Sequence, residues 1–243
     1  MWESPQQFPE LRAGDVHVWK IPLNQTPAVI CALSRALASD ERERAARFHF
    51  EKGRQQYIVS RGALRELLGG YLGESAAAIR FDYSPRGKPG LDTAHASDIA
   101  FNLTHSGALA LAAFARGARV GVDIERMRDE FDSQRIADRF FTPEESAALR
   151  GADESERLLR FAEQWTRKES FIKARGEGLS FPLDAFSILL EGEELALRIA
   201  QSPVEAGRWT VRDLEIDEGY AAALCVEARG SGMRGFVWEG IET

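Results

Sequence analysis

RVGVDIERM, residues 119–127, alternates apolar and polar side chains as a half-buried β-strand does. An earlier stretch, DVHVWKIPL at residues 15–23, has the same alternation. Each stretch is followed by an Arg-Phe pair and then by a long segment of helical spacing that ends at glycine. A duplicated unit predicts this order, so we expect an α+β fold with two similar α+β subdomains related by a pseudo-twofold.

The apolar spacing and the turn residues predict the remaining elements. Helices are expected at 27–37, at about 39–48, at 53–72 with its end at Gly69 and Gly70, and at 156–174. Thr142 and Pro143 suit the cap and the first turn of a further helix. A hairpin is expected at 99–117, and closing strands at 186–192, 194–200, 208–216 and 220–228. We therefore predict a lead-in at 1–14 and subdomains at 15–118 and 119–243, each with helices packed on a small antiparallel sheet.

Composition sets the broad class of the protein. The chain of 243 residues is 44% hydrophobic and 28% charged, as in an ordinary globular protein. Its net charge of −7 argues against nucleic-acid binding, although basic residues gather between Arg42 and Arg65. No stretch approaches the roughly 18 apolar residues of a membrane span, so we expect a cytoplasmic protein with no membrane partner.

Two carboxylates occur in the strand at 119–127. Asp123 and Glu125 are two residues apart, so their side chains point to the same face, where they repel each other unless a positive charge lies between them. A hard cation is one such charge. The alternative is an exposed acidic pair at the edge of a sheet.

A second acidic segment, WTRKESFIKARGEGL at 165–179, falls on the last long helix. Glu169 and Lys173 are four residues apart, and Lys168 precedes the glutamate. By itself this arrangement could be a surface ion pair. The combination of an aromatic residue, a carboxylate flanked by cations and a double-glycine stop instead favours a functional segment.

Five motifs together resemble the 4′-phosphopantetheinyl transferases of the larger, surfactin-synthetase-activating type. They are GKP at 87–89, FNLTHSG at 101–107, GVDIE at 121–125, RFFTPEE at 139–145 and WTRKESFIKARGEGL at 165–179. The resemblance implies transfer of the 4′-phosphopantetheine arm of coenzyme A to a serine hydroxyl of an apo acyl or peptidyl carrier protein. The product released is adenosine 3′,5′-bisphosphate, and the reaction depends on Mg²⁺.

The resemblance also assigns roles to single residues. It makes Asp123, Glu125 and Glu169 the metal ligands, and three carboxylates suit the oxygen coordination of Mg²⁺. It brings the coenzyme's phosphates, pyrophosphate and adenosine into contact with basic and polar residues. These are Arg44, Arg61, Lys88, Thr104, His105, Lys168 and Lys173.

The general base has two candidates in the sequence. Glu145 matches a family glutamate proposed for this role, whereas Glu169 could take the proton from the attacking serine directly. A shift of one residue in the alignment would replace Glu145 by Glu144. We favour Glu169.

Two other functions stay open at the sequence level. A non-catalytic module could bind coenzyme A or a nucleotide through the arginines and His105 without a metal. A metal-dependent phosphohydrolase could use the same carboxylates. The length of the chain favours the larger transferase type, which implies a monomer that contains both units.

Overall fold

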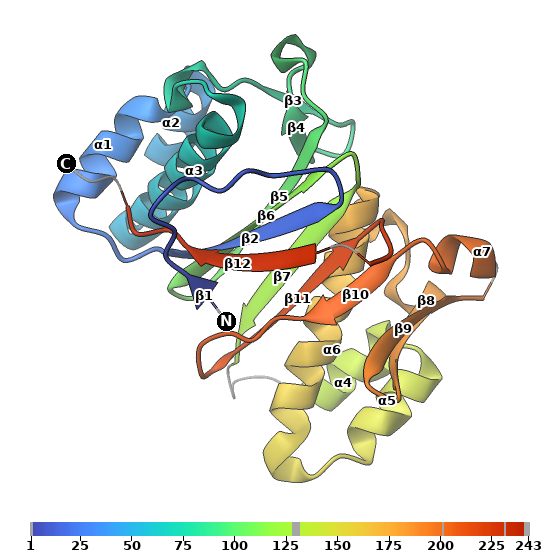
Figure 1. Cartoon of the computed structure of the whole chain (residues 1–243). Coiled ribbons are helices and arrows are strands. Elements are labelled where there is room, and N and C mark those ends of the chain that lie inside the picture. The colour runs from blue at the N-terminus through green and yellow to red at the C-terminus, as the bar shows by residue number, and fades with distance from the viewer. Residues whose placement is uncertain (1, 128–131, 201, 231, 241–243) are drawn as a thin grey trace. The chain divides into compact units, whose positions relative to one another are not determined.

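A computed structural model describes residues 2–127, 132–200, 202–230 and 232–240. The chain divides into two compact units. The first contains residues 1–117 and 232–243, and the second contains residues 118–231. Figure 1 shows the elements of both units.

Among its described residues, the first unit has three α-helices, a five-stranded sheet and a small hairpin. Its helices are α1 (Pro27–Ala36), α2 (Ser39–Ala46) and α3 (Glu51–Leu72). Its sheet has the order β1 (Trp2–Glu3), β12 (Gly232–Val237), β2 (Asp15–Pro22), β6 (Leu109–Arg116) and β5 (Ile99–Ser106). The hairpin consists of β3 (Phe81–Tyr83) and β4 (Pro89–Leu91).

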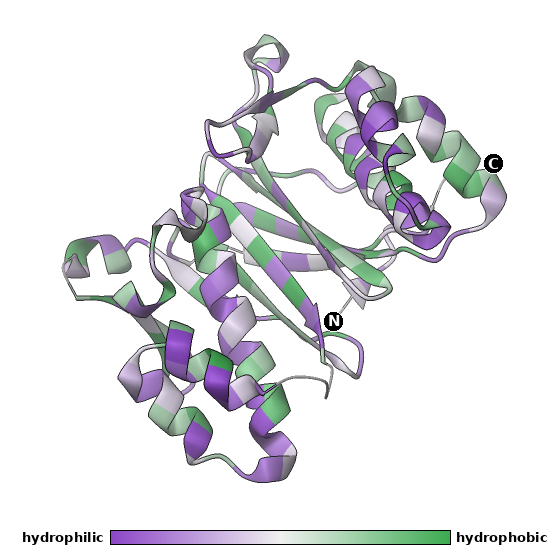
Figure 2. Ribbon diagram, turned by 180° about the vertical axis from the view of Figure 1, so that it is seen from behind, coloured by the Kyte–Doolittle hydropathy of each residue, from purple (hydrophilic) through white to green (hydrophobic). Residues whose placement is uncertain are grey.

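The core of this unit lies between α1, α3 and one face of the sheet. Trp19, Phe114 and Phe236 contribute from the sheet, and Leu33 and Leu64 from the helices. The long helices carry both hydrophilic and hydrophobic residues along their length, as amphipathic helices do (Figure 2). The predicted β5–β6 hairpin is confirmed, with Gly107 at a φ of 60° in its two-residue turn.

The first unit differs from the prediction in its sheet and in its boundaries. Its sheet is mixed rather than antiparallel, because β12 runs parallel to both β1 and β2. The segment at 232–237 therefore belongs to the first unit, and not to the subdomain predicted at 119–243. The boundary predicted after residue 118 differs by one residue from the observed division after Gly117.

Helix α3 ends at Leu72, as its range predicted, but Gly69 and Gly70 do not mark its end. Gly69 and Gly70 lie inside it, and Gly73 ends it with a φ of 68°. A Cβ on Gly69 would lie 2.6 Å from the carbonyl oxygen of Glu74, and one on Gly70 would lie 2.6 Å from the ring of Phe8. These two glycines permit close packing and do not break the helix.

The second unit has four helices and five strands among its described residues. The helices are α4 (Ser133–Phe140), α5 (Pro143–Arg150), α6 (Glu154–Arg175) and α7 (Pro203–Ala206). One sheet has the order β10 (Thr210–Asp213), β11 (Tyr220–Val226) and β7 (Val120–Arg126). A separate hairpin contains β8 (Phe186–Glu191) and β9 (Glu194–Ile199).

Local signals define the helices that matter for the site. Thr142 caps α5 by accepting from Glu145 N, and Pro143 occupies the first turn, as predicted. Gly176 ends α6 with a φ of 75°. Helix α6 packs across β7 and β11 (Figure 1). The helix found at 133–140 was not predicted.

Candidate active site

The face of β7 that α6 covers is identified by Gly121. A Cβ at this glycine would lie 2.2 Å from the carbonyl oxygen of Ser170 and 2.3 Å from the amide nitrogen of Ala174. Because side chains alternate along a strand, Asp123 and Glu125 share this face with Gly121. The prediction that the two carboxylates point to one side is confirmed.

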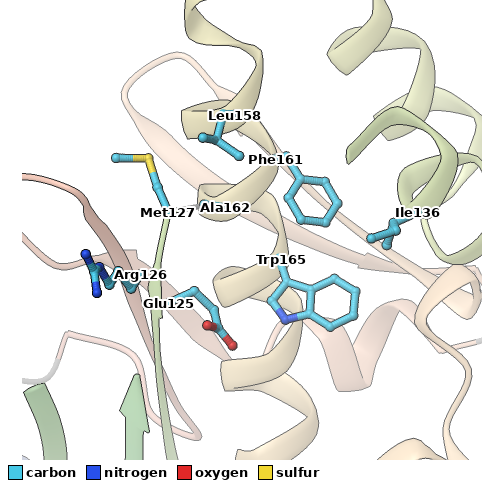
Figure 3. Close-up of a pocket in the computed structure, with 8 residues that line it drawn as sticks. All are labelled: Glu125, Arg126, Met127, Ile136, Leu158, Phe161, Ala162 and Trp165. Carbon is cyan, nitrogen blue, oxygen red and sulfur yellow. The ribbon is translucent and has the colours of Figure 1, made fainter. Parts of the chain in front are cut away.

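Small side chains surround these acids on the neighbouring strand. Ala223 of β11 pairs with Asp123, and Ala221 pairs with Glu125. Asp123 is buried, with 3% of its surface exposed, and Glu125 is half-buried. Figure 3 shows the carboxylate of Glu125 between β7 and α6, close to Trp165.

Helix α6 brings a third carboxylate and an ammonium group to the same place. The Lys173 ammonium lies 2.5 Å from Oδ1 of Asp123. Burial raises the pKa of Glu169, the negative charges of Asp123 and Glu125 add to this rise, and the charge of Lys173 opposes it. These couplings show that the four predicted residues form one electrostatic cluster.

The cluster has the donor chemistry of a magnesium site. Its three carboxylates supply the oxygen ligands that Mg²⁺ prefers, and the small residues Ala221 and Ala223 pair with two of them across the sheet. The carboxylates do not surround a common point, since no group of three or more His, Cys, Asp or Glu in the described part of the chain is arranged to hold a metal. Lys173, bonded to Asp123, supplies positive charge there instead.

A pocket of about 330 Å³ opens beside Glu125 within the second unit (Figure 3). Its lining residues come from β7, α4 and α6 and the residue after β7: Glu125, Arg126, Met127, Ile136, Leu158, Phe161, Ala162 and Trp165. Most of these side chains are apolar. The pocket therefore offers an apolar wall with a carboxylate at one side.

Lys168 and Glu145 lie elsewhere in the second unit and form a buried ion pair. Nζ of Lys168 lies 2.7 Å from Oε2 of Glu145, and the two side chains are 0% and 1% exposed. Burial lowers the pKa of Lys168 to about 8, while the charge of Glu145 opposes this shift. The predicted roles, a coenzyme contact for Lys168 and a general base for Glu145, each require contact with substrate, whereas both side chains are buried.

The first unit contains a buried cluster around Glu41. The guanidinium groups of Arg61 and Arg65 both donate to the Glu41 carboxylate, and the three side chains are at most 9% exposed. Arg61 also donates to the Tyr83 hydroxyl at 2.9 Å and stacks over Phe81 with 4.1 Å to the ring centroid. Two guanidinium groups against one carboxylate leave net positive charge, which suits an anion near Arg61.

The other predicted residues of this unit lie on separate elements. Arg44 is exposed on α2, with its guanidinium 5.5 Å from the ring centroid of Tyr57. Lys88 is half-buried and ends the β3–β4 loop, where its amide donates to Ser84 Oγ. Thr104 is buried and His105 is exposed on β5, and as neighbours on a strand they point to opposite faces.

Comparison with known proteins places most of the chain in one family. Residues 119–225 match the 4′-phosphopantetheinyl transferase superfamily, and residues 23–116 match the 4′-phosphopantetheinyl transferase N-terminal family. The 4′-phosphopantetheinyl transferase HetI of Nostoc sp. strain PCC 7120 is 38% identical over 221 residues, which are 90% of this chain and 91% of that protein. The chain belongs to the 4′-phosphopantetheinyl transferase superfamily.

A second relative of this transferase is Sfp of Bacillus subtilis strain 168, 31% identical over 78% of this chain and 81% of that protein. Among solved structures, the holo-[acyl-carrier-protein] synthase of Thermotoga maritima covers 45% of this chain and 63% of its own, with 23% identity and a TM-score of 0.37. A TM-score of 0.37 is too low to establish a shared fold. The predicted family and transferase activity are confirmed by the sequence relatives.

Sequence reasoning missed several residues that shape the transferase. Gln164 donates to Oε1 of Glu145 at 2.6 Å, and Arg65 completes the Glu41 cluster. Neither stands out in the sequence, because glutamine and arginine on a helix are commonly solvated. Ala221 and Ala223 offered one signal, since alternate small residues in a strand favour the close approach of a helix.

Proposed function

We propose that this transferase uses coenzyme A as donor and a serine hydroxyl of an apo acyl or peptidyl carrier protein as acceptor, with Mg²⁺ as the resident ion. The observation that carries the proposal is the grouping of Asp123, Glu125, Glu169 and Lys173 between β7 and α6. The group lies within the part of the chain that matches the superfamily.

The acidic side chains have two proposed tasks. Asp123, Glu125 and Glu169 would hold Mg²⁺, which when bound neutralises charge on the pyrophosphate. Glu169 is also the proposed acceptor of the proton of the serine hydroxyl.

The transfer then forms one bond and breaks another. The serine oxygen bonds to the phosphorus that carries the pantetheine arm, and the bond from that phosphorus to the bridging oxygen breaks. The electron pair leaves with adenosine 3′,5′-bisphosphate. Lys173 supports this step as a point charge beside the oxygens that become more negative.

We further propose that the pocket beside Glu125 receives the pantetheine arm. Its apolar lining suits the methyl and methylene groups of the arm, and its volume of about 330 Å³ suits a slender ligand. In the first unit, the net positive charge around Arg61 favours a phosphate. Arg44, Lys88, Thr104 and His105 are proposed coenzyme contacts on the family resemblance.

The decisive experiment measures the mass of an apo carrier protein after incubation with coenzyme A and Mg²⁺. The expected product is heavier by one phosphopantetheine arm on its serine. Glu169→Gln should lose at least about 100-fold in kcat, because the proton acceptor and one ligand disappear. Glu156→Gln is the matched control, since Glu156 lies on the same helix and pairs with Arg160 at the surface.

The outcomes separate the candidate functions. No mass change with fatty-acid, polyketide and peptide carriers would contradict carrier modification. Free phosphopantetheine formed without a carrier would indicate a hydrolase.

No described helix has the length and apolar character to cross a bilayer. A cytoplasmic monomer is part of the proposal, with the family resemblance as its support.

A further inference from the structure

The carboxylate of Glu145 is a junction between three elements of the second unit. It accepts hydrogen bonds or an ion-pair contact at 2.6–3.0 Å from five donors. These donors are the amide and hydroxyl of Thr142, Nε2 of Gln164, Nζ of Lys168 and the amide of Ile188. Glu145 thereby joins the start of α5 to α6 and β8.

Lys168 completes the junction from the side of α6. Its ammonium has three hydrogens, and the structure supplies three acceptors. They are Oε2 of Glu145 at 2.7 Å, the carbonyl oxygen of Leu183 at 2.9 Å and that of Phe186 at 2.7 Å. Phe186 also packs beneath the ammonium, with 4.2 Å from Nζ to its ring centroid.

This junction ties the Lys168 side of α6 to α5 and β8. Lys168 and Glu169 are neighbours on the helix, so a rotation that moves one side chain moves the other. Lys173 is one turn beyond Glu169 and shares its face. On the sheet side, the contact of Gly121 with Ser170 and Ala174 sets how closely α6 approaches β7.

We propose that Glu145 and Lys168 are a positioning pair for the transfer reaction, holding α6 so that Glu169 and Lys173 face Asp123. This inference rests on the proposed roles of Glu169 and Lys173. The pair acts through α6, and its buried atoms take no direct part in the chemistry. A displacement of α6 by a fraction of a helical turn would separate the proton acceptor from the serine hydroxyl.

The test compares Glu145→Gln, Lys168→Met and the double variant with the intact enzyme. Each single variant leaves one buried partner unsatisfied, and we expect kcat to fall about 10- to 100-fold while KM for coenzyme A stays within about threefold. The double variant removes both charges and should be no slower than the slower single variant. The pH limbs of kcat should stay in place in all three. Assays are run well below each thermal midpoint.

Several results would overturn the proposal. A rise in the KM for coenzyme A with unchanged kcat in Lys168→Met would make this lysine a coenzyme ligand. Loss of one pH limb in Glu145→Gln, with Lys168→Met near normal activity, would make Glu145 the general base. Gln164→Leu removes one hydrogen-bond donor to Glu145, and it replaces the other variants in the test if they do not fold. It should lower kcat in the same way, and unchanged kcat there would also count against the pair.

A measurement independent of activity separates this inference from the proposed function. Amide hydrogen exchange at 165–175 should accelerate in Lys168→Met and not in the surface control Glu156→Gln. If Glu169→Gln remains fully active, the proposed site is wrong, and the exchange result still decides whether the pair holds α6. Unchanged exchange in Lys168→Met would refute the positioning role.

Discussion

Gly121 of β7 lies against Ser170 of α6 so closely that a Cβ on the glycine would be 2.2 Å from the serine's carbonyl oxygen. The contacted atoms belong to the backbone of α6, and they cannot move aside as the end of a flexible side chain can. We expect Gly121→Ala to lower the free energy of unfolding by about 3 kcal/mol, measured in urea. Gly151→Ala is the control, because its Cβ would meet only ordinary contacts and its φ is −79°. Equal stability of the two variants would contradict the close approach.

Lys173 and a metal ion would compete for the carboxylate of Asp123. Lys173→Met should therefore lower kcat at least about 100-fold without weakening Mg²⁺ binding, because a competing cation is removed. Asp123→Asn should weaken Mg²⁺ binding, because it removes a proposed carboxylate ligand. The Mg²⁺ dependence of the initial rate, together with calorimetry, measures both effects. Weaker Mg²⁺ binding by Lys173→Met would show that the lysine helps to build the metal site.

The pocket beside Glu125 can be narrowed from α4. Ile136 lines it and is half-buried, so Ile136→Trp should raise the KM for coenzyme A about tenfold with a smaller change in kcat. Leu159→Trp adds the same side chain at a site that is 39% exposed and should leave the KM unchanged. A normal KM in Ile136→Trp would place the pantetheine arm elsewhere.

Two groups of the first unit should give opposite pH dependences of stability. Burial lowers the pKa of His17 to about 4, so its stabilising contribution is present above pH 6.5 and is lost as the pH falls. Burial raises the pKa of Glu66 to about 7, against the bond from Trp238, so its contribution is present below pH 4.5 and is lost as the pH rises. Between pH 4.5 and 6.5 the two effects oppose each other.

Glu66→Gln removes the contribution of Glu66 to the pH dependence of stability and leaves that of His17. Between pH 4.5 and 6.5 its free energy of unfolding should fall more steeply on acidification than that of the intact protein, as measured by urea titrations at several pH values. His17→Gln should show the opposite change. Parallel pH curves for the intact protein and both variants would contradict these pKa shifts.

The last strand is anchored in the core of the first unit. Phe236 of β12 is fully buried and packs against Trp19, with 4.9 Å between the two ring centroids. Phe236→Ala should cost about 4 kcal/mol of unfolding free energy, and Met233→Ala, at an exposed position of the same strand, less than about 0.5 kcal/mol. Chemical denaturation measures both. Similar costs would mean that β12 does not complete this core.

Much of this architecture was predictable because its signals are local. A period of two in the sequence placed Asp123 and Glu125 on one face of β7, and a period near 3.6 marked α3 and α6. Thr142 and Gly176 marked the start of α5 and the end of α6, since caps satisfy backbone groups of their own helix. The family motifs contain both kinds of residue: WTRKESFIKARGEGL, for example, includes the helix-ending Gly176 and the site residues Glu169 and Lys173.

The sequence by itself thus determined the α+β elements, the shared face of the two strand carboxylates and the membership of the family. Only the tertiary structure decided that Lys168 and Glu145 are buried against each other, and that β12 returns to the first unit. The physical reason is distance along the chain. Periodicity shows which side of a helix or strand is apolar, but the burial of a charge depends on partners such as the carbonyl groups of Leu183 and Phe186, which only folding brings near.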